Sequence, residues 1–147
     1  MKNVHRGSCL CESVKFEVRG FTGPFELCHC HRCRKFSGSA FFAGIYAESA
    51  NLKFLEGQDL IKIYEAPIVR NPPPYRACFC SRCGSPVPDP NSPHQFVEVP
   101  AGLLDDGPGL IPDKHIFVEH KAHWFEISGD LPRMTEQDIR RHRTATE

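Results

Sequence analysis

The densest group of reactive side chains in this sequence lies between residues 28 and 35. The segment reads Cys-His-Cys-His-Arg-Cys-Arg-Lys, so three cysteines stand at C-x-C-x-x-C spacing. Three thiolates with this spacing can face one soft metal ion, and zinc is the ion that thiolate-rich sites usually bind. Three protein ligands leave one coordination position for water or substrate. Cys28, Cys30 and Cys33, the three-cysteine group below, therefore indicate a catalytic type of zinc site.

Four further cysteines stand in close pairs elsewhere in the chain. They are Cys9 with Cys11 and Cys80 with Cys83, and we call them the four-cysteine group. In an extended C-x-C pair both side chains point to one side, because side chains alternate along a strand. A C-x-x-C pair forms a turn in which two thiolates converge, and Gly84 allows the tight backbone that this turn needs.

The simplest assignment of these seven cysteines gives two zinc ions per chain. The four-cysteine group would complete a closed, structural site that joins segments about 70 residues apart. A structural zinc contributes roughly 10–16 kcal/mol of apparent binding energy, so folding should depend on it. The three-cysteine group would then remain one ligand short, as an open site.

Other assignments of the ligands are possible at this stage. His29, His31 or Cys78 could close the three-cysteine group as a fourth ligand. In an extended segment, however, both histidines would alternate with the cysteines and face away from the metal. Cys78 has the character of a buried spare thiol. His115, His120 and His123 lack ligand spacing toward either group, and we expect most of them at the surface.

Three permanent cations accompany the three-cysteine group, namely Arg32, Arg34 and Lys35. Zinc with three thiolates carries a formal charge of minus one, which these cations would offset. They could also bind the carboxylates of a substrate. The alternative is an ordinary solvated face.

Short alternating or apolar runs between turn signals predict a mainly β fold of short antiparallel strands. The expected strands are 14–18, 25–28, 40–46, 52–55, 60–64, 75–79, 95–99, 115–119 and 124–127, with 52–64 as a hairpin. One short C-terminal helix should begin after Thr135, which can cap it, and run to about residue 142.

The composition fits one globular domain over residues 1–147, with its core at about 5–134. The 18 basic and 18 acidic side chains balance, which argues against nucleic acid as the main partner. No apolar run is long enough to cross a membrane, and the first residues lack the apolar core of a signal peptide. We therefore expect a cytoplasmic protein whose thiols are reduced, so that the cysteines bind metal in place of forming disulfides.

The cysteine blocks resemble those of the glutathione-dependent formaldehyde-activating enzyme family, which shares its domain type with centromere protein V. The resemblance rests on residues 7–11, 28–38 and 79–85, together with 112–117 and 121–125. Order and spacing match over roughly residues 5–134. Two residues depart from the family pattern: Glu12 stands where glycine is usual, and Cys78 is an additional cysteine. If the backbone at residue 12 has positive φ, Glu12 carries a strain of about 1 kcal/mol or more.

The resemblance implies a zinc-stapled β-tent and a carbon–sulfur lyase. Such an enzyme acts on a glutathione–formaldehyde adduct of the S-hydroxymethylglutathione type. It also implies the zinc assignment reached above by ligand counting. The rival interpretations are a non-enzymatic zinc module that binds a protein or nucleic acid, as centromere protein V-type relatives suggest, and a redox or metal-buffering protein.

Overall fold

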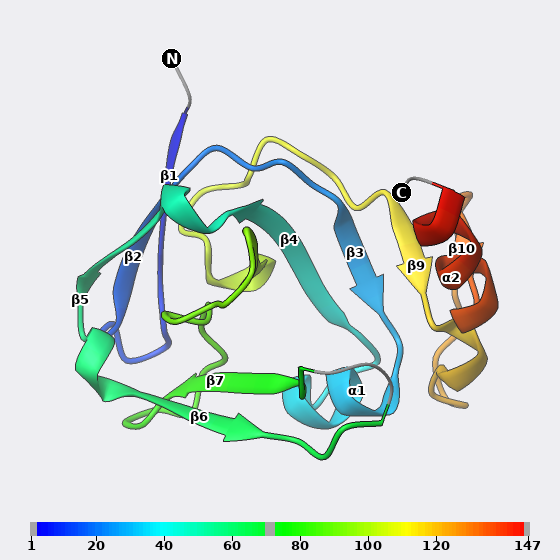
Figure 1. Ribbon diagram of the computed structural model, residues 1–147, viewed down its shortest axis with the longest axis horizontal. Helices are drawn as coiled ribbons and strands as arrows, with labels where there is room; N and C mark the ends of the chain where they lie inside the picture. Colours follow the sequence, from blue (N-terminus) through cyan, green and yellow to red (C-terminus); the bar gives the residue numbers. More distant parts are fainter. Residues whose placement is uncertain (1–2, 70–72, 146–147) are drawn as a thin grey trace. The chain divides into compact units, whose positions relative to one another are not determined.

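The structure, a computed structural model, describes residues 3–69 and 73–145 (Figure 1). These residues are mainly β, as the sequence predicted. The strands are β1 Val4–Ser8, β2 Lys15–Arg19, β3 Phe25–Cys28, β4 Phe42–Glu48, β5 Leu52–Glu56, β6 Ile61–Glu65, β7 Arg76–Cys80, β8 Phe96–Pro100, β9 Lys114–Ile116 and β10 Arg133–Met134. The α-helices are α1 His31–Ser37 and α2 Glu136–Ala145, and the short 3-10 helices are η1 Ser49–Asn51, η2 Gln58–Leu60, η3 Ala101–Leu103 and η4 Val118–His120.

The chain forms two compact units. The first unit comprises Met1–Gly23 and Ile45–Gly109, and the second comprises Pro24–Gly44 and Leu110–Glu147. The chain passes from the second unit to the first within β4. Each unit has a cluster of buried side chains that includes cysteines, so each is described separately below.

The first unit contains two small antiparallel sheets, together with β8, which pairs with β4 in a larger sheet. β1 pairs with β2 from Val4↔Arg19 to Ser8↔Lys15, and β2 pairs in turn with β5. β6 pairs with β7, and Figure 1 shows these two strands side by side. Phe16 and Val18 on β2, with Val14 just before it, are fully buried, because alternate side chains of a strand face the core.

The predicted hairpin over residues 52–64 is wrong. β5 pairs with β2 and β6 pairs with β7, so the two segments belong to different sheets. Between them Gly57 adopts a left-handed conformation with φ of 74°, and η2 follows it. This turn redirects the chain instead of folding it back on itself. The sequence therefore has the residue types of a hairpin turn, but the strands on either side of this turn do not pair with each other.

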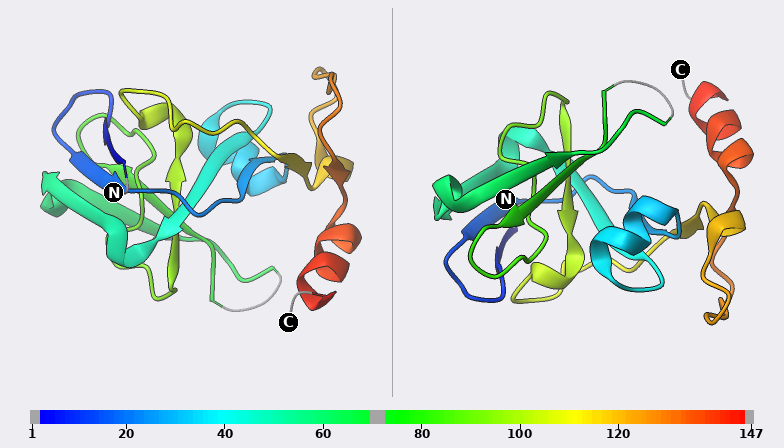
Figure 2. Two further views of the ribbon diagram at one scale, coloured as in Figure 1. Left: turned by 90° about the horizontal axis from the view of Figure 1, so that it is seen from above. Right: turned by 90° about the horizontal axis from the view of Figure 1, so that it is seen from below.

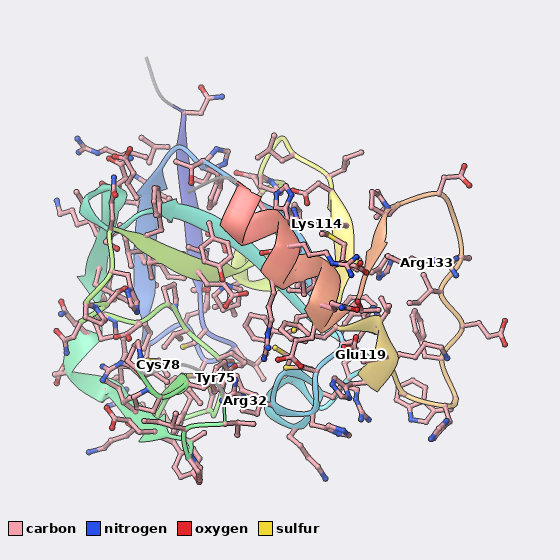
Figure 3. The ribbon with its side chains drawn as sticks, turned by 45° about the vertical axis from the view of Figure 1, so that its right-hand side comes forward. Arg32, Tyr75, Cys78, Lys114, Glu119 and Arg133 are labelled. Atoms are coloured by element: carbon pink, nitrogen blue, oxygen red, sulfur yellow. The ribbon has the colours of Figure 1, made fainter. Side chains whose placement is uncertain are left out.

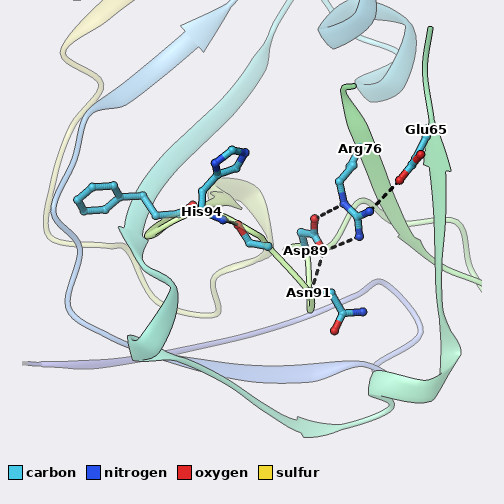
Figure 4. A network of polar contacts seen from close by, with 7 residues as sticks. Glu65, Arg76, Asp89, Asn91 and His94 are labelled. Atoms are coloured by element: carbon cyan, nitrogen blue, oxygen red, sulfur yellow. Dashed lines mark hydrogen bonds and ion pairs between the residues drawn. The ribbon is translucent and has the colours of Figure 1, made fainter. Parts of the chain in front are cut away.

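An ion-pair network that is partly exposed to solvent connects the start of β7 to its surroundings (Figure 4). Arg76 Nε lies 2.6 Å from Asp89 Oδ2, and a second guanidinium nitrogen lies 2.9 Å from Glu65 Oε1 on β6. Asp89 also accepts a hydrogen bond of 2.8 Å from the backbone N–H of Asn91. The network thus connects β6, β7 and the proline-rich loop after β7, and β7 ends at Cys80.

The second unit contains parallel pairing, which corrects the prediction of antiparallel strands for this part of the chain. β3 pairs with β9 in parallel, with Cys28 opposite Ile116, and β9 pairs with β10 in parallel. Parallel neighbours need a long connection between them, and 85 residues separate the ends of β3 and the start of β9. Local turn signals therefore could not reveal this pairing.

Two strand predictions and the helix count also change in the second unit. The predicted strand 115–119 shortens to β9 and gives way to η4, and the predicted strand 124–127 is a turn followed by irregular chain. Figure 2 shows this orange segment between β9 and the C-terminal helix. α2 matches the predicted helix, with Thr135 Oγ1 accepting a hydrogen bond from the N–H of Asp138. α1 was not predicted.

Candidate metal centres

The four-cysteine group comes from two places in the first unit. Cys9 and Cys11 lie in the loop between β1 and β2, and Cys80 and Cys83 lie at the end of β7 and in the turn after it. All four sulfurs lie within 4.8 Å of one another. The Cys11 sulfur lies 3.6 Å from that of Cys9 and 3.9 Å from that of Cys80. A tetrahedral zinc with Zn–S bonds of about 2.3 Å places its sulfurs about 3.8 Å apart, so this group fits zinc.

Backbone turns hold these sulfurs in place. Gly84 has φ of 78°, as the sequence predicted for a tight C-x-x-C turn, and its N–H donates to the carbonyl of Cys80 at 2.8 Å. In the other loop the N–H of Val14 points at Cys9 Sγ at 3.3 Å. Donors of this kind stabilise a thiolate. Glu12 has φ of 62°, so the positive φ suspected from its departure from the family pattern is confirmed.

Ser85 joins the two loops of the four-cysteine group. Its hydroxyl oxygen accepts a hydrogen bond of 2.9 Å from the N–H of Leu10 and lies 3.3 Å from Cys83 Sγ. Cys83 Sγ donates to this oxygen, and the contact with Ser85 lowers the pKa of Cys83 to about 5. Burial raises the pKa of Cys9 to about 11, so this thiol needs a cation to become a thiolate at neutral pH.

The three-cysteine group is local and lies in the second unit. Cys28 ends β3, Cys30 caps α1, and Cys33 lies in the first turn of that helix. The sulfur of Cys30 accepts a hydrogen bond of 3.4 Å from the N–H of Cys33. The segment is therefore a strand end followed by a helix, and not the extended segment we assumed. The missed signal was Gly38, which ends the helix with φ of 64° after two basic residues.

The three sulfurs of this group lie within 4.8 Å of one another and are buried. Among the described residues, no fourth Cys, His, Asp or Glu ligand atom completes the set. Hydrogen bonds from Cys28 and Cys33 lower the pKa of Cys30, whereas contacts with Cys28 and Cys30 raise the pKa of Cys33. A thiolate in this group is thus stabilised by hydrogen bonds from the other two thiols. A divalent ion can replace the protons of these thiols, so this donor set also fits a zinc ion.

The surroundings of the three-cysteine group are apolar. Phe42, Ile116 and Ile139 are buried against it, and Phe117 packs beside them. Phe117 has φ of 56°, an unfavourable conformation for an aromatic residue. Strained residues persist only where surrounding contacts hold them, and they occur often at functional sites. Apolar surroundings of this kind strengthen the interaction between a cation and thiolates.

His29 and His31 lie outside the ligand sets, in keeping with the prediction, but they differ from each other. His29 is fully buried, and its Nε2 lies 2.8 Å from Nδ1 of His115. Its ring packs against Phe41 and Phe125. Burial, with His115 nearby, lowers the pKa of His29 to about 4, so the ring is neutral. The expectation of a surface position is wrong for His115, because it lies on β9 and its side chain is buried.

The three predicted cations of α1 have different positions. Arg34 is half-buried and donates to His31 Nδ1 at 2.9 Å, whereas Lys35 is exposed. Arg32 is half-buried on the other side of the helix, and Figure 3 labels it across α1 from Glu119. Helix geometry explains this separation, since residues two apart point in nearly opposite directions. The three cations therefore do not form one surface.

Cys78 is a buried thiol of β7, as predicted. It is 2 % exposed and packs in the first unit with Val14 and Val87. Figure 3 labels its position. Burial raises the pKa of Cys78 to about 12, so it stays protonated and apolar in character. It lies outside the four-cysteine group formed by the described residues.

Glu119, His120 and Glu136 form a third group of possible ligands, which the sequence analysis missed. Sixteen positions separate His120 from Glu136, so no spacing pattern marks the group. Its carboxylates are already engaged: Glu119 accepts a hydrogen bond of 2.8 Å from the N–H of Glu136, and Glu136 pairs with Arg140 at 2.9 Å. The group therefore stabilises the start of α2.

The fold and the two thiol groups define a mainly β protein with two sites of the kind that bind zinc. A family model described as "Glutathione-dependent formaldehyde-activating enzyme" matches residues 4–120. A Halomonas elongata protein named "Putative glutathione-dependent formaldehyde-activating enzyme" is 34% identical over 125 residues, which cover 82% of this chain and 79% of that protein. The chain belongs to the glutathione-dependent formaldehyde-activating enzyme family.

A solved structure supports the same fold. The crystal structure of a Rhodobacter sphaeroides protein superposes with a TM-score of 0.53 at 18% sequence identity, covering 87% of this chain and 98% of that one. In the described part of the chain, no helix combines the length and the apolar character that a membrane span requires.

Proposed function

We propose that this protein is a zinc-dependent carbon–sulfur lyase that acts on the adduct of a thiol and an aldehyde. Glutathione is the proposed thiol, and S-hydroxymethylglutathione is the type of adduct. One observation carries the proposal: the described residues supply four converging sulfurs at one centre and three at the other. The family membership of the chain supports the same reaction.

In this proposal the two centres have different tasks. Cys9, Cys11, Cys80 and Cys83 hold a structural zinc, and Cys28, Cys30 and Cys33 hold a catalytic zinc. Zinc at the latter would supply one coordination position for a thiol sulfur. The surrounding Phe42, Ile116 and Phe117 keep water away from the sulfurs, which favours a desolvated thiolate.

The reaction itself conserves atoms and charge. In the direction of synthesis, the thiol sulfur forms a bond to the carbonyl carbon while the C=O π bond breaks, and the thiol proton ends on the new hydroxyl oxygen. The reverse direction releases the aldehyde. No oxidant is needed. The eight thiols of the chain are free, which suits a reducing compartment, and we propose the cytoplasm.

Two measurements test the proposal. Metal analysis should give close to two zinc ions per chain. NMR exchange spectroscopy of added glutathione and formaldehyde should show faster exchange with the protein than without it, and Cys30→Ser should abolish the acceleration while the fold is retained. Absence of acceleration by a fully loaded, folded protein would contradict the lyase assignment. Salt-dependent DNA binding by the same sample would favour the binding-module interpretation.

A further inference from the structure

A cavity of about 300 Å³ lies beside α1 in the second unit. It is lined by two residues of α1 and by six consecutive residues of the segment after β9, namely His31, Arg34, Glu119, His120, Lys121, Ala122, His123 and Trp124. His31 and Arg34 are three positions apart and so share one face of the helix. Cys30 and Cys33 occupy the neighbouring face of the same turns. Each of the two α1 residues that line the cavity therefore directly follows a cysteine of the three-cysteine group in the chain.

The charge of this cavity favours an anion. Arg34 and Lys121 contribute permanent positive charges, and Glu119 contributes the one carboxylate of the lining. That carboxylate accepts a hydrogen bond of 2.8 Å from the N–H of Glu136, so it is turned toward the start of α2. Lys121 Nζ donates to the carbonyls of Phe125 at 2.9 Å and Ala122 at 3.4 Å, which fixes its charge at the edge of the cavity.

Arg34 has a donor without an acceptor. Its Nε is buried and makes no hydrogen bond to any described residue, although another guanidinium nitrogen donates to His31 Nδ1 at 2.9 Å. A buried unpaired donor is costly, and a guanidinium binds a carboxylate through two parallel hydrogen bonds. The arrangement around Arg34 therefore lacks an oxygen acceptor that a ligand could provide.

Trp124 adds an apolar surface to the same cavity. It is the only tryptophan of the chain, and 73 % of its surface is exposed. The edge of the Phe125 ring contacts it, with ring centroids 6.4 Å apart, while the rest of the indole is open. An aromatic ring offers a large, rigid apolar surface against which a ligand can pack. The indole can cover the carbon atoms of a ligand whose carboxylate reaches Arg34.

We propose that this cavity binds a carboxylate-bearing arm of the thiol substrate, with Arg34 as the specificity-determining contact and Trp124 as the covering surface. The inference rests on the proposed function, since it places the thiol at the neighbouring three-cysteine group. It also narrows the sequence prediction, because Arg34 lines the cavity whereas Arg32 and Lys35 do not. The substrate class is thus an anionic peptide-like thiol, and not a neutral one.

The single tryptophan makes a direct binding test possible. The zinc-loaded protein is titrated with S-methylglutathione, which keeps both carboxylates but has no free thiol, and Trp124 fluorescence is recorded. The diethyl ester of the same compound, which lacks both carboxylates and keeps its ammonium group, is the control without carboxylates. We expect saturable binding of the acid, and binding of the ester that is at least about tenfold weaker, as the loss of charge-assisted hydrogen bonds requires.

Variants then locate the contact. Arg34→Gln should weaken acid binding at least about tenfold, and Arg34→Lys should restore part of it, because the charge returns without the planar donor pair. Lys62→Gln is the matched control, since it removes an exposed charge in the first unit, and affinity should change less than about twofold. Circular dichroism and zinc content show whether each variant is folded.

Three results would overturn the inference: equal binding of acid and ester, an unchanged affinity in folded Arg34→Gln, or an equal loss in Lys35→Gln, which would indicate the general charge of α1. The outcome is independent of catalysis. A protein that binds S-methylglutathione through Arg34 but does not accelerate the exchange would retain the subsite and lose the lyase assignment. If the protein accelerates the exchange and Arg34→Gln leaves this acceleration unchanged, the lyase assignment would be retained and the subsite would be lost.

Discussion

The two cysteine groups differ in how the chain brings their sulfurs together. The four-cysteine group joins two loops whose cysteines are 69 or more positions apart, whereas the three-cysteine group lies within one strand end and one helical turn. A metal in the first group must oppose the entropy of closing a long loop, and one in the second closes only a short one. The first is thus suited to stabilising a fold, and the second to presenting a preformed donor set.

Their surroundings differ in the same sense. The four-cysteine group includes Cys11, which is exposed. Cys9 Sγ accepts a hydrogen bond from the N–H of Val14, and Cys83 Sγ donates one to the Ser85 hydroxyl. The sulfurs of the three-cysteine group are buried among phenylalanines and isoleucines. A position in the coordination shell that is surrounded by apolar side chains favours a soft, weakly hydrated ligand such as a thiolate over water.

Removing one cysteine from each group gives the largest expected effect and tests the comparison directly. Cys80→Ser should abolish cooperative thermal unfolding of the first unit, because a structural zinc contributes roughly 10–16 kcal/mol and a whole domain is stable by only about 5–15 kcal/mol. Cys30→Ser should reduce the zinc content from two to one and leave the protein folded. Calorimetry and metal analysis provide the readouts.

Cys78→Ala is the control for this pair, because Cys78 is buried on β7 two positions from Cys80 and lies outside the ligand set. It should retain two zinc ions. If Cys80→Ser and Cys30→Ser lowered the stability equally, the division into a structural and an open site would be wrong.

Two glycines with similar backbone conformation test how rigid the support of each group is. Gly57 and Gly38 have φ of 74° and 64°. A Cβ at Gly57 would lie 2.0 Å from the carbonyl oxygen of Ser13, in the loop of the four-cysteine group, whereas a Cβ at Gly38 would meet no atom within 4 Å. Gly57→Ala should cost about 3 kcal/mol from strain and overlap, and Gly38→Ala about 1 kcal/mol. Chemical denaturation of both variants measures the difference, and equal losses would show that the loop at Ser13 yields freely.

Each group also has a non-glycine residue with positive φ next to it: Glu12 beside the first and Phe117 beside the second. Glu12 is exposed and its side chain does little packing, so Glu12→Gly should raise stability by about 1 kcal/mol or less. Phe117→Gly relieves similar strain but loses the packing of a ring against the three-cysteine group, and it should lower stability. Thermal unfolding of the two zinc-loaded variants gives the signs, and stabilisation by Phe117→Gly would remove the packing argument.

The sequence predicted which thiols converge better than it predicted the strand pairing around them. Thiols that are two or three positions apart converge because of the local backbone geometry. The convergence of Cys80 and Cys83, the turn at Gly84 and the positive φ at Glu12 could therefore be expected without a structure. The parallel pairing of β3 with β9 depends on 85 intervening residues, and no local pattern encodes it. α1 was missed because cysteine at a helix cap is uncommon and the metal pattern suggested an extended segment.

The cavity beside α1 was missed for a related reason. Arg34 was a candidate because it stands beside the three-cysteine group in the sequence. Its neighbours at the cavity are residues 119–124, and only the fold brings them to α1. The burial of His115 depends on the pairing of β9 with β3. In this arrangement Nδ1 of His115 lies 2.8 Å from Nε2 of His29. Residues whose roles depend on distant strands cannot be assigned from spacing.

The smallest expected effect concerns the pH dependence of the second unit. The N–H and hydroxyl of Thr135 each donate to Asp138 Oδ2 at 2.8 Å, and these hydrogen bonds lower the pKa of the Asp138 carboxyl. A carboxyl whose pKa is lower in the folded state contributes stability above its unfolded pKa of 3.8, and this contribution is lost as the pH falls through the folded value. Asp138→Asn should therefore destabilise α2 slightly at neutral pH, and the difference from the parent should shrink below pH 4. Amide hydrogen exchange of α2 at several pH values measures this. A difference that grows toward acid pH would contradict the assigned role of the Thr135–Asp138 cap. An effect confined to α2 would show that this part of the second unit is stabilised by local contacts. The four-cysteine group of the first unit, in contrast, joins distant segments.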